Sequence, residues 1–430
     1  MTNHSLFKRL VGFALLFALL IPAATVSSGG LDLQGDTSAQ SGGGPIGNTG
    51  FPISPVSNAS GHYSEVRPSV VYNSGFMQTY LAVWDQADSS STNTVVYGQF
   101  MDRDGRLTGY RFRISPELGP NINADVSYDP TRDRYLVVYE VGIGIYGQFI
   151  SNAGARLGSE TTIVTGLVPT DTFYTSAVAY SPTSDKYLVT WRHNQGSSQG
   201  IEARTLSGDG LTWSSVWGLT GMIAGDPDLP DVAYSSPTDQ FLVVWEQTNT
   251  DPDHDIYGQR IQMGGSPGPV GSVFSIHYTE NDETAPAIAA IAKLTGIGQY
   301  LVTCQVDYGG VPSIDGRLVT DAGVLDGSPI YISPGKGYWP GVAGNDHTQE
   351  YLAAWVQGTQ VQARTISTAG ALDTVAYLTG RDPAHAAIAS GPLGDFLITV
   401  DDRVSPSYPY DIFGYMWGTR VFLPLVTRNN

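Results

Sequence analysis

The sequence predicts an all-β fold, a seven-bladed β-propeller of four-stranded antiparallel blades. An apolar run that starts with an aromatic residue recurs in steps of 45 to 59 residues, and a fixed period of this size indicates a repeat array. Each copy has three further short runs rich in Val, Ile, Tyr, Phe and Trp, which is the strand signal. Beyond residue 28 no stretch keeps a helical apolar period long enough for a helix. The seven runs begin at Tyr80, Tyr135, Tyr187, Phe241, Tyr300, Tyr351 and Phe396.

The four predicted strands of each unit follow a constant order. The first holds small and β-branched residues, as in "PSVVY" at 68–72, and the second is apolar on both faces, as in "YLVVY" at 135–139. A third strand such as "VYGQF" at 96–100 leads into a Gly turn, and a fourth such as "FRISP" at 112–116 closes the unit. In the third unit we expect the fourth strand near residues 213–217. A second strand without a polar face suits a blade that is covered by a neighbour on each side.

The segment "FPISP" at 51–55 precedes the first complete unit but matches two fourth strands, "FRISP" and "IYISP" at 330–334. We therefore expect it to supply the outer strand of the last blade and so to close the ring. Pro52 is tolerated there, because an outermost strand pairs on one side only. The alternative outer strand is "RVFLPLV" at 420–426.

The N-terminus reads as an export signal. Lys8 and Arg9 precede an apolar run at 10–21, and small residues follow as far as Ser28. The predicted organisation is a signal peptide at 1–28, a Gly/Ser-rich linker at 29–50, the propeller at 51–420 and a tail at 421–430; an uncleaved anchor is the alternative for the first segment. We expect a secreted or extracytoplasmic protein with no membrane span after the signal is removed.

Charge and cysteine content exclude several classes of function. Without residues 1–28 the chain has 20 basic and 40 acidic residues, a net charge of −20, which argues against nucleic acid as a partner. Cys304 is the single cysteine, so an internal disulfide is impossible. It occupies a position that holds Trp or Tyr in five other units, and we therefore expect a buried packing residue. We expect a monomer.

The repeats resemble those of secreted bacterial β-propellers that carry "YLVVW…DIYGQR…G" units, as in "FLVVW" and "DIYGQR" within residues 241–260. The resemblance covers residues 51–420. It implies the fold and an extracytoplasmic location, but no activity, because propellers carry many unrelated functions.

The loops between the second and third strands vary in length and charge while the strands stay constant. That variation places specificity on one face of the ring. The residue directly after the second strand is polar in most units, and we expect a mostly acidic rim that binds a ligand, with solvated strand ends as the alternative. These rim residues are Asp85, Glu140, Arg192, Glu246 and Asp401.

Three aromatic residues, Tyr308, Tyr408 and Tyr410, lie in the variable loops and are candidates for stacking on a sugar. The other Trp and Tyr residues of the repeats are expected in the core.

The loop "DPDHD" at 251–255 is a candidate Ca²⁺ site, because Asp251, Asp253 and Asp255 alternate there. The calcium-loop pattern is broken, however: no Gly follows Asp255, and Pro252 restricts Asp251 to extended backbone. An acidic hairpin loop is the alternative, and no other cofactor is expected.

No zinc-protease helix motif, nucleophile elbow or P-loop occurs in the chain. The predicted function is therefore binding or scaffolding of a protein or glycan through the variable face. The alternative is a carbohydrate-active enzyme, a glycoside hydrolase or lyase, with acidic residues on the same face.

Overall fold

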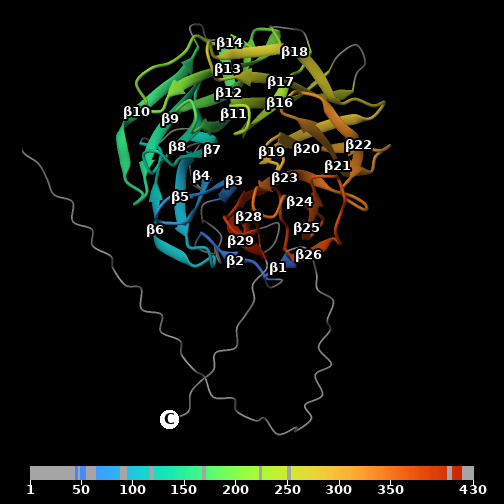
Figure 1. Ribbon diagram of the computed structural model, residues 1–430. Helices are drawn as coiled ribbons and strands as arrows, with labels where there is room; N and C mark the ends of the chain where they lie inside the picture. Colours follow the sequence, from blue (N-terminus) through green and yellow to red (C-terminus); the bar gives the residue numbers. More distant parts are fainter. Residues whose placement is uncertain are drawn as a thin grey trace, which may run out of the picture. The chain divides into compact units, whose positions relative to one another are not determined.

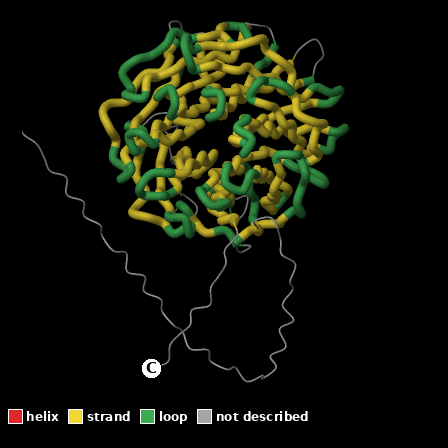
Figure 2. The backbone as a smooth tube through the Cα atoms, viewed as in Figure 1, coloured by secondary structure: helices red, strands yellow, loops and turns green. Residues whose placement is uncertain are grey.

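The computed structural model describes residues 44–46, 49–54, 64–87, 94–116, 121–166, 171–221, 225–248, 253–403 and 409–418. These residues form 29 strands and no helix. The strands make seven antiparallel sheets arranged around a ring, as Figures 1 and 2 show. The predicted seven-bladed propeller is thus confirmed. In this part of the chain no helix is long and apolar enough to cross a membrane.

The first strand of each blade lies innermost, and each inner strand contacts the next around the ring, with the seventh returning to the first (Figure 1). These strands surround the axis of the ring, so residues of the inner strands line any pocket on that axis. The inner strands are β3 (Ser64–Tyr72), β7 (Asn121–Asp129), β11 (Asp171–Ser181), β15 (Asp228–Ser235), β19 (Asp282–Ala292), β23 (Tyr338–Asn345) and β27 (Ala386–Ser390).

The second strands carry the apolar runs by which the repeat is recognised. They are buried over almost their whole length, because both faces pack between neighbouring blades. Cys304 lies in this layer, free and buried, so its expected packing role is confirmed. The second strands are β4 (Tyr80–Ala87), β8 (Arg134–Val141), β12 (Lys186–Gln195), β16 (Gln240–Thr248), β20 (Gly298–Asp307), β24 (Glu350–Gln357) and β28 (Phe396–Asp402).

The third strands pair with the second strands in unbroken register. They are β5 (Thr94–Met101), β9 (Gly144–Ser151), β13 (Ser198–Ser207), β17 (His254–Gln262), β21 (Pro312–Thr320), β25 (Gln360–Ser367) and β29 (Asp411–Gly418).

The fourth strands form the outer edge, and several begin earlier than the sequence predicts. The first is at 107–113 rather than 112–116, because its exposed residues give no apolar alternation. In the third blade the outer strand is reduced to Trp217–Gly218 and an isolated bridge from Trp213 to Leu206, which agrees with the expected place near residues 213–217. The fourth strands are β6 (Leu107–Arg113), β10 (Arg156–Thr165), β14 (Trp217–Gly218), β18 (Gly268–His277), β22 (Leu325–Tyr331) and β26 (Ala376–Thr379).

The N-terminal segment closes the ring. Strand β2 (Phe51–Pro52) pairs with β29 in the last blade, with Phe51 opposite Gly414. The shared Ile-Ser pair explains the match with the other fourth strands. Ser54 accepts a hydrogen bond from Ile412 N–H at 2.8 Å, as do Ser115 and Ser333 from the third strands of their own blades. The alternative closing strand at 420–426 lies outside the described residues.

The predicted linker at 29–50 extends too far towards the propeller. Strand β1 (Gly44–Pro45) also pairs with β29, and Ile46 N–H donates to the Met416 carbonyl at 2.8 Å. A strand of two residues that includes Gly and Pro has no periodic side-chain pattern, and it therefore cannot be recognised from sequence. Residues 1–43, including the predicted signal peptide, lie outside the described part of the chain.

Candidate functional site

A backbone bulge begins six of the seven inner strands. In each, one residue other than Gly adopts left-handed backbone geometry, with φ between 47° and 54°, and the pairing with the second strand shifts there, as between Val66 and Ser69. Such a conformation is uncommon outside Gly, Asn and Asp. The six residues are Arg67, Asn123, Thr175, Leu229, Ala285 and Trp339.

The four predicted rim carboxylates hold four of these six bulges in place. Asp85 accepts hydrogen bonds from the backbone N–H groups of Asn123 (2.7 Å) and Ala124 (3.3 Å) in the following blade. Glu246 accepts one from Ala285 N–H at 2.6 Å. Glu140 contacts Thr175 N–H and Asp401 contacts Arg67 N–H in the same way. We call these four carboxylates the blade latches, because each ties one blade to the next.

The blade latches are buried, so the alternative interpretation as solvated strand ends is wrong. Desolvation on burial raises the pKa of Asp85 to about 7, although the two backbone donors favour its charged form. It raises the pKa of Glu246 to about 7 as well. Their contacts give the latches a structural role, and direct contact with a ligand stays a prediction for them.

Arg192 takes the corresponding position in the third blade. There the second strand supplies a positive charge, and the carboxylates belong to the next blade. Its guanidinium pairs with Asp228 and with Asp226 Oδ1, the latter at 2.8 Å. Asp228, the first residue of the next inner strand, accepts the N–H of Leu229 at 2.7 Å. The carboxylate that holds the bulge thus comes from the next blade itself, and Arg192 anchors it.

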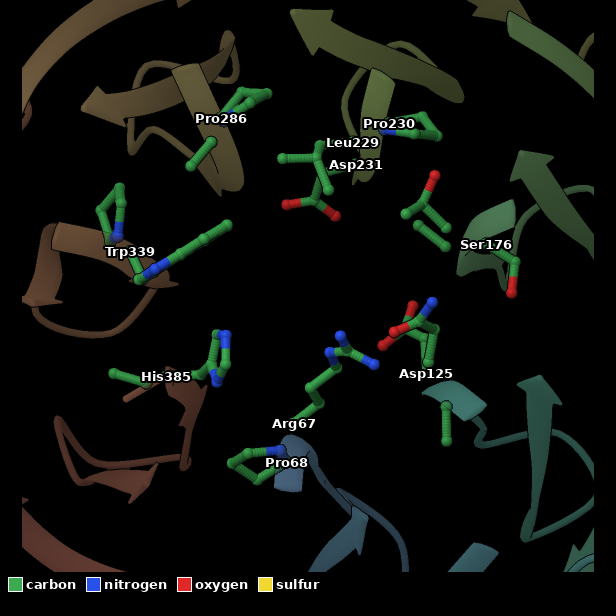
Figure 3. A pocket seen from close by; sticks show the side chains of 17 residues that line it. Arg67, Pro68, Asp125, Ser176, Leu229, Pro230, Asp231, Pro286, Trp339 and His385 are labelled. Atoms are coloured by element: carbon green, nitrogen blue, oxygen red, sulfur yellow. The ribbon is translucent and has the colours of Figure 1, made fainter. Parts of the chain in front are cut away.

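An axial pocket opens where the seven inner strands begin. Its volume is about 280 Å³, just below the roughly 300–1,000 Å³ range of ligand pockets. The bulge residues and the residues after them line it, and they surround the axis in Figure 3. The start of each inner strand lies beside the end of a second strand, as Val66 beside Asp85. The pocket therefore lies on the face that the sequence predicts for specificity.

Three large side chains give the axial pocket its chemical character. Trp339 is 43% exposed, and its ring centroid lies 5.2 Å from that of His385. His385 Nδ1 lies 2.9 Å from Oδ2 of the buried Asp401, so Nδ1–H donates to the carboxylate and Nε2 is left as the acceptor. Arg67 extends towards the centre of the pocket in Figure 3.

Two carboxyl groups lie further along the inner strands, each two residues after a bulge residue. Asp125 accepts the hydroxyl of Ser69 (2.6 Å) and Val178 N–H (2.8 Å), and Asp231 accepts Ile288 N–H at 2.9 Å. Burial raises the pKa of both, that of Asp231 to about 7 with a further contribution from the charge of Asp125. They add a second set of ties between blades at the pocket.

The predicted aromatic contacts are dispersed. Tyr308 is 36% exposed, faces Tyr331 and donates its hydroxyl to Asp315 Oδ2 at 2.6 Å. Tyr410 lies under the Arg403 guanidinium, 4.7 Å from it. Tyr408 lies outside the described residues. The structure does not bring Tyr308 to the axial pocket, and a sugar-stacking role for these residues stays a prediction.

A buried ionic cluster lies beside Tyr308, between the fourth and fifth blades. His277 at the end of β18 is 3.6 Å from Glu283 and 3.5 Å from Asp315. Burial by itself lowers the pKa of His277, but the hydrogen bonds and charges of the two carboxylates outweigh it and raise that pKa to about 9. The imidazolium thus joins two blades.

The candidate Ca²⁺ loop is only partly within the described residues, since Asp251 lies outside them. Asp255 is buried at the start of β17, while Asp253 is half-buried ahead of it. Within the described ranges no group of three or more His, Cys, Asp or Glu side chains is placed to hold a metal ion. The Ca²⁺ site stays a prediction.

The axial pocket is the feature that sequence reasoning missed. A signal was present: the position of Arg67 holds seven different residues in the seven units, directly before the constant inner-strand pattern. Variation at a fixed place in a repeat indicates function, and this position lies outside the longer loops to which the sequence prediction assigns specificity.

Comparison with known proteins identifies the fold alone. No protein-family model matches the chain, and neither does any curated protein. Among solved structures, the chain is similar to a protein of unknown function from Dyadobacter fermentans, with 9% identity and a TM-score of 0.52 over 86% of this chain and 99% of that one. It is also similar to the polysaccharide lyase Uly1, with 6% identity and a TM-score of 0.53 over 88% of this chain and 98% of that one.

Proposed function

We propose that this protein is an exported glycan-binding propeller and that the axial pocket takes a saccharide unit. The observation that carries the proposal is the indole of Trp339, held half-exposed in the pocket wall. Left-handed backbone costs an ordinary residue about 1–2 kcal/mol, so Gly or Asn would be easier to fold at this position. A large aromatic residue at φ 49° therefore indicates a role other than stability.

The surroundings of Trp339 suit a sugar. A flat aromatic face packs against the C–H face of a pyranose, while neighbouring polar groups meet its hydroxyls. Asn123, Thr175 and His385 supply such groups within the same pocket. The similarity of the fold to a polysaccharide lyase agrees with a glycan as the ligand class.

A second candidate function is enzymatic, and one observation favours it. His385 is oriented by a buried carboxylate through Nδ1 and is one-third exposed, which is the arrangement of a general base whose Nε2 removes a proton from a bound sugar. In this alternative the same pocket binds a glycan and cleaves it.

The test is a glycan array probed with the full chain, alongside a panel of glycoside hydrolase and lyase substrates. We expect binding to a restricted set of glycans that is lost in Trp339→Ala and retained in Tyr110→Ala, which removes a 95% exposed aromatic ring on β6. Binding that survives Trp339→Ala but disappears in Tyr308→Ala would move the site to the predicted loop aromatics and overturn the proposal.

A further inference from the structure

We infer that the axial pocket recognises a hexuronic acid at the end of a glycan chain, with Arg67 pairing with its carboxylate. This inference rests on the proposed function and adds the charge and the position of the sugar that is bound. Three features of the pocket lead to it: the state of the Arg67 side chain, the surrounding carboxylates and the ring of inner strands around the pocket.

Arg67 is held by its backbone and not by its side chain. Its N–H donates to Asp401 Oδ2 at 3.2 Å, and the side chain is exposed within the pocket. Among the described residues its guanidinium has no ion pair or hydrogen bond. Other arginines near the blade junctions do, such as Arg132 with Asp185 and Arg111 with Glu65. The charge of Arg67 favours the ionised forms of Asp85 and Glu140, but its N–H donors point at neither of them and are available to a ligand.

The carboxylates around Arg67 are already engaged. Asp85, Asp125 and Asp401 each accept backbone N–H groups, and these bonds fix them in the walls. A guanidinium offers parallel donors that match the two oxygens of a planar carboxylate. A uronate carboxylate fits this geometry, whereas a tetrahedral sulfate ester on the sugar would use the charge without the planar match.

The pocket lies inside a continuous ring of strands. Seven inner strands contact one another around the axis, and Pro68, Pro230, Pro286 and Pro340 follow the bulge residues in the wall. Figure 3 shows lining residues on all sides of the axis, with Arg67 reaching towards the centre. An internal residue of a polysaccharide has a neighbour on each side, and both neighbours would have to pass over the surrounding strands. A chain end can enter along the axis.

The test is calorimetric titration of the full chain with four matched oligosaccharides. One ends in a hexuronic acid, one carries the methyl ester of that acid, one has the acid capped by a neutral sugar, and one bears a sulfate in place of the carboxylate. We expect the first to bind about 10- to 100-fold more tightly than the other three, the range expected for a charge-assisted pair. Its affinity should fall as salt is added.

The protein-side variants are Arg67→Gln, Arg67→Lys and the control Arg106→Gln, which removes a charge from an exposed turn. Arg67→Gln should lower the affinity for the free acid to that for the methyl ester, Arg67→Lys should give an intermediate value, and Arg106→Gln should have no effect. Equal affinity for acid and ester would overturn this inference while leaving glycan binding intact, and the ester comparison holds even if an Arg67 variant fails to fold. Failure of all four ligands, together with an empty glycan array, would overturn the proposed function itself.

Discussion

The carboxylate of Asp85 lies 2.7 Å from the backbone nitrogen of Asn123, although the two residues belong to different blades. One side chain thereby serves two purposes. It joins neighbouring blades, and it holds a left-handed residue whose side chain lines the axial pocket. Stability of the ring and shape of the pocket depend on the same hydrogen bonds, and this gives predictions that separate the two.

Replacing Asp85 with Ala should destabilise the protein by about 1–3 kcal/mol, because two buried N–H groups of the next blade lose their acceptor. Asp85→Asn keeps one oxygen acceptor in nearly the same shape and should cost less. Denaturant unfolding followed by tryptophan fluorescence measures both. If the two variants cost the same, the charge rather than the acceptor is what matters.

Thermal stability should fall steadily from pH 5 to pH 9.5. Burial raises the pKa values of Asp85 and Asp231 to about 7, so the folded state holds those protons more tightly than the unfolded state, and stability declines as pH rises from about 4 to 7. The raised pKa of His277, about 9, makes stability depend on pH over a second, more alkaline range. Its contribution is complete below about pH 6.5, the pKa of an unperturbed histidine, and is lost as pH rises through 9.

Variants assign the two pH windows. His277→Gln should make the melting temperature less dependent on pH between pH 6.5 and 9, and should leave its dependence between pH 4 and 7 unchanged. Asp85→Asn should reduce the fall in melting temperature between pH 4 and 7. A wild-type melting temperature that rises with pH across either window would contradict the sign of the corresponding shift.

Gly414→Val should weaken closure of the ring by about 1–3 kcal/mol through overpacking. A side chain at Gly414 would meet the Phe51 ring, with Cβ 2.6 Å from Cζ, and would displace β2 from β29. Limited proteolysis should then release the N-terminal segment faster than in wild type. Gly44→Ala is the matched control, since a Cβ there meets nothing within 4 Å.

Trp339→Gly should leave the stability within about 1 kcal/mol of wild type, because relief of the left-handed backbone offsets the loss of a half-exposed indole. Ala285→Gly relieves the same conformation without removing a large side chain and should raise stability by about 1 kcal/mol. Both are measured by chemical unfolding. A loss above about 2 kcal/mol in Trp339→Gly would identify the indole as part of the core instead of a ligand platform.

The architecture was predictable because it depends on features that repeat. Second strands such as 135–139 are buried on both faces, and the Ile-Ser-Pro triplets that start at Ile53, Ile114 and Ile332 each accompany the outer strand of a blade. The start of β6 and the whole of β1 were missed, since an exposed edge strand is held mainly by backbone hydrogen bonds that any residue can make.

The candidate site was only partly predictable. The sequence singled out Asp85, Glu140, Glu246 and Asp401 and the correct face, but not that they are buried beneath the pocket rather than on its rim. The position of a bulge depends on the pairing register and not on residue type. The residues next to Arg67 and Trp339 in sequence therefore do not predict left-handed backbone there. Their convergence on the axis arises only when the ring closes.

Closure of that ring has a consequence for synthesis and quality control. Ser54 emerges from the ribosome early, yet its partner Ile412 lies 358 positions later, so the last seam cannot form until almost the whole chain exists. A chain that ends prematurely exposes the unpaired margins of its terminal sheets, which invite aggregation and proteolysis. Only a complete chain can therefore form the closed ring, and truncated chains remain open to proteolysis.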